Sequence, residues 1–559
     1  MSKNQYAIGV DYGTNSVRAI VVDLSNGAMI GQNVYNYPTG EAGIIVDSKD
    51  PNLARQNPAD YINGFIASVK KAVAAAKRAV AGFSPENVVG IGVDTTGSTP
   101  IPVDENGTAL ALLPEFKDNP AAHAWLWKDH TSTAEAEEIT RKAANYKVKY
   151  LDKCGGTYSS EWYWAKILHC VRTAPQVAAA AASWVELADF VPGYITGKTK
   201  PNEIPRGICA AGHKAMYNEQ WGGLPSDEFL NSLSPKLARF KYTFKAIPTT
   251  EKAGELIPAV AKKVGLPAGI AVAVGAFDCH LGAVGCGVKP GTLVKTIGTS
   301  TCDIMVSPLT EQIADIPGLC GIVPESVLPG MYGLEAGQSA VGDIFNWFVN
   351  NLTPVEYTKK GSAHVNLTEQ AQQYAPGATG LLALDWNNGN RTVLVDQELS
   401  GLLVGQTIRT TAPEVFRALI EATAFGALTI INRLEEYGVK VKEVVNCGGI
   451  AEKNDFIMQI YADVCNRPMK ISRSSQTCAL GAAIVATVAA GAFKSVATAQ
   501  KKMTGIKEKI YKPNKAAVKI YAKLYKLYKD LHDAFGDTGK TLPLNDVMKE
   551  LIAIRKSTR

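Results

Sequence analysis

The chain has 559 residues, more than one hydrophobic core normally supports, and 46% of them are hydrophobic. We therefore expect two domains with a core each. Its 58 basic and 52 acidic residues give a net charge of +6. This charge is too small to predict binding to nucleic acid or to a membrane surface. A mildly basic protein suits small anionic ligands.

The ten cysteines form neither a disulfide framework nor a metal-binding pattern, because none belongs to a Cys-x-x-Cys pair. A chain of this length does not need disulfides to fold, so we expect reduced thiols. The sequence has no charged leader before an apolar segment, and no apolar run is long enough to cross a membrane. These features predict a cytoplasmic protein.

Short strands and longer helices alternate along the chain. Runs rich in valine and isoleucine have the length and flanks of buried strands, whereas alanine-rich segments have helical spacing. The predicted strands cover residues 6–10, 17–23, 88–93, 270–277, 293–297 and 443–447, and the predicted helices lie near residues 60–81, 134–145 and 414–436. This alternation predicts an α/β fold.

A segment with glycine and proline, GVKPG at residues 287–291, interrupts this pattern and marks the predicted domain boundary. We expect an N-terminal domain of residues 1–288 and a C-terminal domain of residues 289–559, with a helical tail from about residue 510. The tail has the apolar spacing of a packing helix. Its predicted buried face consists of Val518, Tyr521, Leu524, Tyr525, Tyr528, Leu531 and Phe535.

Two distant segments, residues 6–23 and 292–307, have the same pattern of an apolar strand, a Gly-Thr turn with small polar residues, and a second apolar strand. Such a turn offers backbone N–H groups and hydroxyls to an anion, and its glycines permit close approach. The hydroxyls belong to Thr14, Ser16, Thr299, Ser300 and Thr301. The duplication predicts two lobes that grip one polyphosphate.

Three of the predicted strands end in a carboxylate, at Asp11, Asp94 and Asp278. Open α/β sheets collect ligands at the carboxyl ends of their strands, although an aspartate there also caps turns. Phosphoryl transfer needs a carboxylate for Mg²⁺ and another for the proton of the acceptor hydroxyl. Asp11 suits the metal and Asp278 the general base. Asp94 suits either the metal, directly or through water, or the substrate.

A site for the nucleotide base is predicted at residues 444–456, where a strand precedes Gly448, Gly449 and a helix that includes Asn454. Missing side chains there allow a purine or ribose to lie against the backbone, although a Gly-Gly pair also makes an ordinary tight turn. The small residues at 477–492 predict a helix that packs closely against this site or is simply buried.

Binding of a sugar requires charged hydrogen-bonding groups and an aromatic face in the same cleft. Isolated lysines and glutamates are more often solvated surface charges, which is the alternative for each candidate. The candidates are Trp127, Lys128, Asp129, His130, Lys214 and Glu335.

Taken together, these motifs resemble the FGGY carbohydrate kinases of the actin, Hsp70 and sugar-kinase superfamily. The resemblance covers about residues 5–535. It rests, in chain order, on GVDYGTNSVRAIVVD, GVDTTGST, GAFDCHLGAVG, TIGTST, NCGGIAEKNDFIMQIYADV and ALGAAIVA. It implies two ribonuclease-H-like domains with mixed sheets that flank a cleft.

Within that family, five further segments are most similar to the members that act on a ketopentose. These segments are residues 54–61, 114–131, 211–217, 334–343 and 384–391. The similarity implies MgATP-dependent phosphorylation of L-ribulose to L-ribulose 5-phosphate in L-arabinose catabolism. A homodimer is the assembly considered.

The resemblance also implies roles for individual positions. Asp278 matches the catalytic base. The nucleotide positions are Asp11, Thr14, Asn15 and Ser16 in the first phosphate motif, Thr299 and Ser300 in the second, and Gly448 and Gly449 in the adenosine motif. The ketopentose positions are Gly97, Trp127, Lys214, Asp278 and Glu335.

Two positions depart from the expected pattern, since many relatives have alanine where this chain has Gly97 and phenylalanine where it has Thr95. The departures concern sugar selectivity and not the chemistry. A kinase for another ketose or polyol, such as D-ribulose, xylulose, ribitol or glycerol, is therefore the first alternative. The second is a nucleotide switch like actin or Hsp70, which needs no acceptor base.

Overall fold

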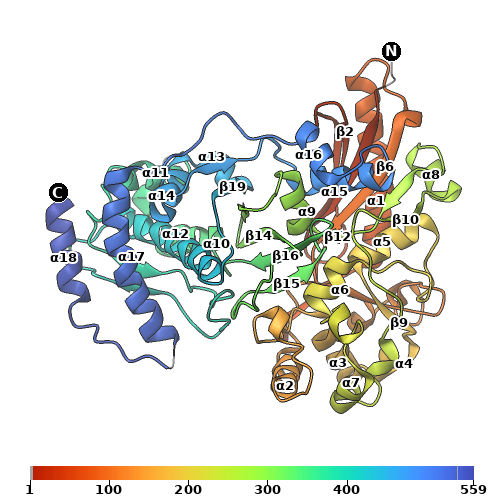
Figure 1. The fold of residues 1–559 in the computed structure, drawn as a ribbon, viewed down its shortest axis with the longest axis horizontal. Helices are drawn as coiled ribbons and strands as arrows, with labels where there is room; N and C mark the ends of the chain where they lie inside the picture. The colour runs from red at the N-terminus through yellow and green to blue at the C-terminus, as the bar shows by residue number, and fades with distance from the viewer. Residues whose placement is uncertain (1–3, 360, 538, 559) are drawn as a thin grey trace.

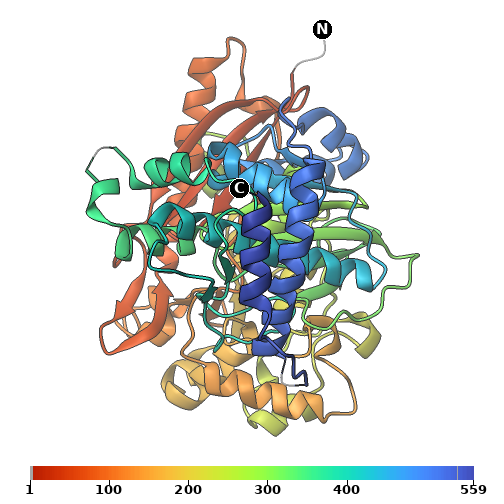
Figure 2. The same cartoon turned by 90° about the vertical axis from the view of Figure 1, so that its left-hand side faces the viewer.

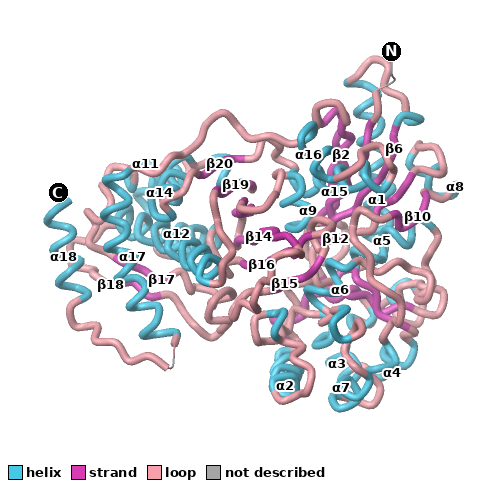
Figure 3. The backbone as a smooth tube through the Cα atoms, viewed as in Figure 1, coloured by secondary structure: helices cyan, strands magenta, loops and turns pink. Residues whose placement is uncertain are grey.

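The computed structural model describes residues 4–359, 361–537 and 539–558. Two mixed β-sheets form its framework, one from the N-terminal half of the chain and one from the C-terminal half (Figure 1). Helices surround the sheets and also lie between them (Figure 3). The predicted α/β fold is confirmed.

The first sheet is built around the first predicted hairpin. In it, β1 (Tyr6–Tyr12) pairs antiparallel with β2 (Ser16–Asp23) and parallel with β6 (Val88–Thr95). The remaining strands are β3 (Met29–Asn36), β10 (Lys252–Glu255), β11 (Ala271–Ala273) and β12 (Ala276–Phe277), and the order is β10-β11-β6-β1-β2-β3 with β12 also paired to β6.

The second sheet repeats this topology around the second predicted hairpin. Here β13 (Thr292–Ile297) pairs antiparallel with β14 (Thr301–Pro308) and parallel with β19 (Glu443–Cys447). The order β3-β2-β1-β6-β11 of the first sheet corresponds, strand direction included, to β16-β14-β13-β19-β20 of the second, which confirms the predicted pair of ribonuclease-H-like folds. The other strands are β15 (Gly321–Pro324), β16 (Met331–Ala336) and β20 (Met469–Ile471).

The prediction of one continuous strand over residues 270–277 was wrong, because the structure divides it into β11 and β12. Between them, the Val274 N–H donates to the carbonyl oxygen of Glu251 at 3.0 Å and leaves the ladder. A Cβ atom on Gly275 would lie 2.0 Å from the carbonyl oxygen of Ala188. The close approach of another backbone thus accompanies the break, and sequence periodicity carries no information on it.

Two helices, α9 (Asp278–Gly285) and α15 (Thr477–Ala489), lie between the sheets (Figure 1). Although α15 follows the last strand of the second sheet, it packs on β1 and β6, whereas α9 contacts β13 and β14. A Cβ atom on Gly9 would lie 1.7 Å from the carbonyl oxygen of Ala479, so only glycine permits this packing. Each of the two helices thus packs on the sheet of the other half of the chain, and the start of α9 lies between the sheets. The domain boundary at residue 288 stays a prediction.

Helices occur where alanine-rich segments predicted them. The first, α1 (Pro58–Ala79), begins at Asn57, whose side chain accepts a hydrogen bond from the Ala59 N–H. Its apolar face, including Phe65 and Val69, is buried. The other helices of the N-terminal half are α2 (Thr133–Ala144), α3 (Tyr163–Thr173), α4 (Pro175–Ala180), α5 (Leu187–Thr196), α6 (Ile208–Lys214), α7 (Asp227–Leu233) and α8 (Pro258–Val264).

The C-terminal half ends in α17 (Lys515–Gly536) and α18 (Val547–Thr558), which lie side by side (Figure 2). The packing helix predicted for the tail is confirmed, but Phe535 is 56% exposed and does not belong to its buried face, while Leu527 does. The other helices here are α10 (Gly342–Asn351), α11 (Ala363–Ala371), α12 (Ala412–Glu436), α13 (Gly449–Lys453), α14 (Asp455–Cys465) and α16 (Val496–Met503).

Three small sheets supplement this framework, and the one that includes β5 and β8 lies next to the site described below. In the described part of the chain, none of the helices has both the length and the apolar character that crossing a bilayer requires. The strands of the small sheets are β4 (Ile45–Asp47), β5 (Asp50–Gln56) and β8 (Ala124–Trp125), then β7 (Pro100–Val103) and β9 (Ser183–Glu186), then β17 (Leu382–Leu384) and β18 (Leu402–Val404).

Candidate active site

A cavity of about 330 Å³ takes its wall from both halves of the chain. Many of the residues that the sequence predicted for sugar or phosphate binding meet there, although they are far apart in the sequence. They are Gly97, Trp127, His130, Lys214 and Asp278 from the N-terminal half, and Thr299, Ser300 and Glu335 from the C-terminal half. The cavity is therefore the candidate site.

Lys214 and Glu335 form an ion pair in this wall. Lys214 is the last residue of α6 and Glu335 lies in β16, with 2.8 Å between Nζ and Oε1. Burial opposes the charge of both groups, but each charge stabilises the other, so that the pKa of Lys214 is raised and the pKa of Glu335 is lowered. The cavity thus contains a fixed donor and a fixed acceptor for the hydroxyls of a polyol.

Two buried histidines stand behind Glu335. His213 Nδ1 lies 3.3 Å and His280 Nε2 3.6 Å from Glu335 Oε2, and the two Nε2 atoms are 3.0 Å apart. Burial lowers the pKa of His280 to about 4 and that of His213 well below its ordinary value, so both rings are neutral at pH 7. Sequence reasoning gave them no role, and the available signal was their position beside Lys214 and Asp278.

Asp278 is the first residue of α9 and lines the cavity. One carboxylate oxygen accepts a hydrogen bond of 2.6 Å from the N–H of Cys279. Burial, and then the negative charge of Asp11, raise the pKa of Asp278 to about 7. A carboxylate with this pKa is suited to accept a proton near neutral pH.

Asp11 and Asp94 are neighbours across the parallel pair β1 and β6. Asp94 is fully buried, and neither of its carboxylate oxygens has a hydrogen-bond partner among the described residues. Burial and the charge of Asp11 raise the pKa of Asp94 well above its ordinary value, and burial also raises that of Asp11, whose Oδ2 lies 3.7 Å from Arg18 Nη1. Burial raises the pKa of all three carboxyl groups, and the charge of Asp11 raises those of Asp94 and Asp278 further. A cation bound between them would stabilise their ionised form.

The turn of the first hairpin reaches the cavity through Trp127. Its indole N–H donates to Thr14 Oγ1 at 3.1 Å, and the Gln56 side-chain amide donates to the carbonyl oxygen of Thr14 at 2.6 Å. The side-chain amide of Asn15 donates to the carbonyl oxygen of Ala42 at 2.7 Å. None of residues 13–16 lines the cavity, so the turn stands beside the cavity and not in its wall.

The turn of the second hairpin lines the cavity directly with Gly298, Thr299 and Ser300. The carbonyl oxygen of Thr299 accepts hydrogen bonds from the N–H groups of Val341 and Asp343, which fix the turn against the start of α10. Among the described residues, the hydroxyls of Thr299 and Ser300 make no hydrogen bond. Both hydroxyls are thus available to an anion.

The predicted adenosine motif follows β19. Gly448 has φ of 94°, a conformation that favours glycine, and a Cβ atom on Gly449 would meet nothing within 4 Å. Asn454 accepts a hydrogen bond from the Ile457 N–H and caps α14. These three residues lie outside the wall of the cavity, on the segment that continues from the carboxyl end of β19.

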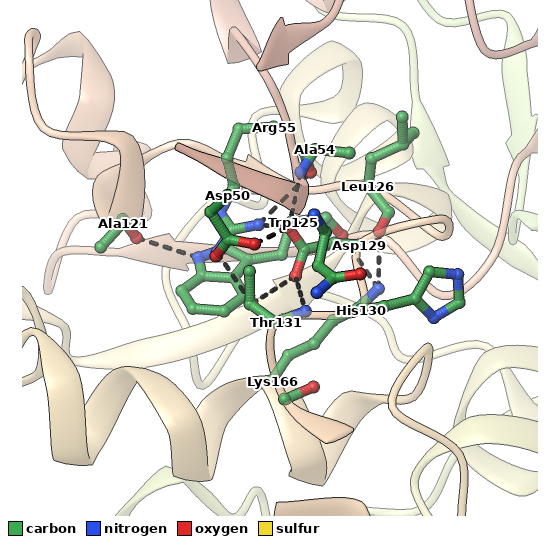
Figure 4. Close-up of polar contacts among 12 residues, drawn as sticks. Asp50, Ala54, Arg55, Ala121, Trp125, Leu126, Asp129, His130, Thr131 and Lys166 are labelled. Atoms are coloured by element: carbon green, nitrogen blue, oxygen red, sulfur yellow. Dashed lines mark hydrogen bonds and ion pairs between the residues drawn. The ribbon is translucent and has the colours of Figure 1, made fainter. Parts of the chain in front are cut away.

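The segment 127–130 divides between the cavity and the core. Trp127 and His130 line the cavity, and His130 Nδ1 lies 3.0 Å from Ser160 Oγ. Lys128 does not line it, and Asp129 is fully buried and forms an ion pair with Arg55 (Figure 4). Because neighbouring side chains on this loop point in different directions, Asp129 supports the wall from behind.

Sequence reasoning also missed several residues of the wall. Arg391 lines the cavity with Nη2 3.8 Å from Glu161 Oε1, and its signal was its place at the end of the family-like segment 384–391. Half of the cysteines line the cavity as well, and no motif predicted this. They are Cys154, Cys279, Cys302, Cys320 and Cys478.

Comparison with known proteins agrees with this geometry. Residues 6–285 match the N-terminal domain and residues 293–490 the C-terminal domain of the FGGY family of carbohydrate kinases. The chain is 43% identical to a ribulokinase of Halalkalibacterium halodurans, covering 99% of this chain and 98% of the relative, and 41% identical to a ribulokinase of Vibrio parahaemolyticus, covering 94% and 95%. Its fold is similar to that of a gluconate kinase from Lactobacillus acidophilus, with a TM-score of 0.77 and 19% identity over 96% of this chain and 99% of the other.

Proposed function

Because the chain belongs to the FGGY family of carbohydrate kinases, and is therefore an ATP-dependent sugar kinase, we propose that its acceptor is L-ribulose. The product is L-ribulose 5-phosphate, formed in L-arabinose catabolism. The relatives named ribulokinase at about 40% identity over nearly the whole chain support this acceptor. The observation that carries the mechanism is Asp278 in one cavity with Lys214, Glu335 and the second hairpin.

In this mechanism Asp278 is the general base. As the O5 oxygen of the sugar attacks the γ-phosphorus, its proton passes to the Asp278 carboxylate, and the bond from the γ-phosphorus to the bridging oxygen breaks and releases ADP. The raised pKa of Asp278, about 7, supports this role, because a base is most effective when its pKa lies near the working pH.

Lys214, Glu335 and Trp127 are the proposed sugar contacts. The Lys214 ammonium donates to hydroxyl or carbonyl oxygens, the Glu335 carboxylate accepts from hydroxyl groups, and the indole of Trp127 offers an apolar face to the C–H side of the sugar. Gly97 is also in the wall, and a Cβ atom at this position would lie 2.0 Å from the ring of Phe277, so the ring occupies the place of a side chain. The more distant candidates Lys128 and Asp129 have less support, since neither lines the cavity.

The two hairpins are the proposed grip on the phosphates. Thr299 and Ser300 offer unpaired hydroxyls, and the turn with Thr14, Asn15 and Ser16 offers backbone N–H groups from the other half of the chain. Gly448 and Gly449, with Asn454 nearby, are the proposed adenosine site, because the open space over Gly449 suits a flat base.

Asp11 and Asp94 are the residues that would hold Mg²⁺. The two residues fit this ion, because carboxylate oxygens are the preferred ligands of Mg²⁺. In the described structure, both oxygens of the buried Asp94 also lack a hydrogen-bond partner. When bound, Mg²⁺ neutralises negative charge on the phosphate oxygens. Burial, and then the negative charge of Asp11, keep the pKa of Asp278 high.

A comparison of kcat/KM for L-ribulose, D-ribulose, xylulose, ribitol and glycerol tests the acceptor. We expect the largest value for L-ribulose, since the wall combines a charged pair with an aromatic face for a ketopentose. A larger value for any other member of the panel would replace L-ribulose as the substrate and leave the kinase assignment intact.

Release of ADP with and without sugar tests whether turnover depends on the acceptor, which an actin-like or Hsp70-like switch does not need. We expect strong stimulation by the sugar. Slow hydrolysis of ATP that no sugar accelerates would contradict the assignment of Asp278 as the base. A cytoplasmic location and a homodimeric assembly are further proposals, which cell fractionation and light scattering would test.

A further inference from the structure

Lys166 lies in α3, and its side chain is completely buried. Its Nζ donates to three backbone carbonyl oxygens, those of Ser98 at 2.9 Å, Leu126 at 2.8 Å and Trp125 at 3.3 Å. A protonated lysine has three N–H donors and a neutral amine only two. The three acceptors therefore match the ammonium form, which the nearby Glu186 also favours.

The three carbonyl oxygens belong to two separate segments of the sugar wall, the loop with Ser98 and the end of β8 with the loop that follows it. Ser98 directly follows Gly97, and Leu126 directly precedes Trp127. Gly97 and Trp127 both line the cavity, whereas Lys166 does not. Lys166 thus binds the backbone of both loops on the side away from the cavity. Two of its acceptors, Ser98 and Leu126, are the direct sequence neighbours of the proposed sugar contacts Gly97 and Trp127.

Neighbouring charges fix the remaining sides of the same loops. Glu186 accepts a hydrogen bond from the Ser98 hydroxyl and another, of 2.8 Å, from the Thr99 N–H. On the second loop, Asp129 pairs with Arg55 and accepts a hydrogen bond of 2.7 Å from the Ala54 N–H (Figure 4). With these supports in place, the spacing between the two loops depends on the three bonds of Lys166.

We propose that Lys166 is a positioning residue that sets the distance between Gly97 and Trp127 and thereby the fit of the sugar. The inference rests on the proposed role of these two residues in sugar binding. Burial lowers the pKa of Lys166 to about 7, and the negative charges of Glu186 and Glu161 oppose this shift. A displacement of about 1 Å in a substrate contact is enough to reduce catalysis by about 10²-fold.

Steady-state kinetics of Lys166→Met test the proposal, because methionine fills similar space without any donor. We expect the KM for the sugar to rise by about 10-fold or more while the KM for ATP changes less than about 2-fold. Lys166→Arg, which keeps the positive charge and its donors, should recover part of the loss. Lys198→Met is the control for loss of a lysine donor, since Lys198 Nζ also donates to a carbonyl oxygen, that of Ala253 at 2.7 Å, but Lys198 is exposed and its acceptor belongs to neither loop.

A residue needed only for folding would give another result. It would lower the active fraction, and so kcat, together with the melting temperature, and would leave the sugar KM unchanged. An unchanged sugar KM in well-folded Lys166→Met, or equal increases in the KM values for sugar and ATP, would overturn the proposal. If Lys166→Met does not fold, Lys166→Gln provides the same comparison with fewer donors.

Measurements on the wild-type enzyme distinguish a failure of this inference from a failure of the proposed function. If the wild-type chain prefers another sugar, the measurements on Lys166 are made with that sugar, and the expected split between the two KM values stays the same. Thermal shifts give a second readout that does not need turnover. Saturating sugar should raise the melting temperature of Lys166→Met less than that of the wild type, and ATP should raise both equally.

Discussion

The indole N–H of Trp127 donates to the hydroxyl of Thr14 at 3.1 Å, and this hydrogen bond joins the sugar wall to the turn of the first phosphate hairpin. Trp127 lines the cavity, and Thr14 lies in the turn between β1 and β2. Movement of one side chain therefore affects the other. The bond offers a direct physical route by which occupation of the sugar site aligns the phosphate grip.

A double-mutant cycle should detect this coupling. Trp127→Phe keeps the aromatic face but loses the donor, and Thr14→Val keeps the shape but loses the acceptor. We expect each change to lower kcat/KM by about 5-fold or more, and the double variant to lose less than the product, with a coupling of about 1 kcal/mol. Strictly multiplicative losses would show that the bond does not contribute to turnover.

Removal of the proposed base should affect the chemical step and not nucleotide binding. We expect Asp278→Asn to lower kcat by about 10²-fold or more, because the amide cannot accept the proton, while the Kd for ATP stays nearly constant. Single-turnover kinetics and equilibrium titration with ATP measure the two quantities. Normal turnover of Asp278→Asn would exclude Asp278 as the base.

The raised pKa of Asp278 predicts a pH profile. Burial and Asp11 raise this pKa to about 7, so the carboxyl is protonated and inactive as a base below that pH and is ionised above it. We expect kcat/KM for the sugar to increase with pH through about 7. A carboxyl with an ordinary pKa would already give a flat profile above about pH 5. The residual activity of Asp278→Asn should lack this step.

Substitution of Lys214 should weaken sugar binding selectively. Lys214→Met removes the partner of Glu335 and leaves a buried carboxylate whose pKa must then rise. We expect kcat/KM for the sugar to fall by about 10²-fold or more and the affinity for ATP to stay the same. Isothermal titration with each ligand separates the two effects, and equal losses for both ligands would point to misfolding instead.

Asp11 and Asp129 make a matched pair for the metal assignment. Asp11→Ala should raise the Mg²⁺ concentration for half-maximal rate by about 10-fold or more, since it removes a proposed ligand. Asp129→Ala should leave the Mg²⁺ dependence alone but destabilise the protein by about 3–5 kcal/mol, because the buried Arg55 loses its partner. Mg²⁺ titrations of the rate and urea unfolding distinguish them. An Mg²⁺ dependence that Asp11→Ala leaves unaltered would refute its role as a ligand.

Local sequence patterns were sufficient for the elements and for much of the site. Both hairpins and the helix over residues 58–79 agree with the predictions from local patterns. The five ketopentose positions that the family resemblance implied, Gly97, Trp127, Lys214, Asp278 and Glu335, line one cavity, while their roles stay predictions. Strand and helix periodicity and turn residues are properties of short segments, and the carboxyl ends of parallel strands necessarily meet at one edge of a sheet. These features can therefore be predicted from the sequence alone.

Other features depend on which segments meet in three dimensions. The sequence could not separate Trp127, in the wall, from Asp129 two residues later, because the direction of a loop side chain depends on its buried partner, here Arg55. The same holds for the His213–His280 pair and for Lys166, whose acceptors lie in two distant loops. The sequence by itself determined the two sheets and the residues proposed as reacting groups, because both depend on short segments. Tertiary packing alone decided burial, pKa and loop spacing, because these depend on neighbours that sequence distance does not reveal.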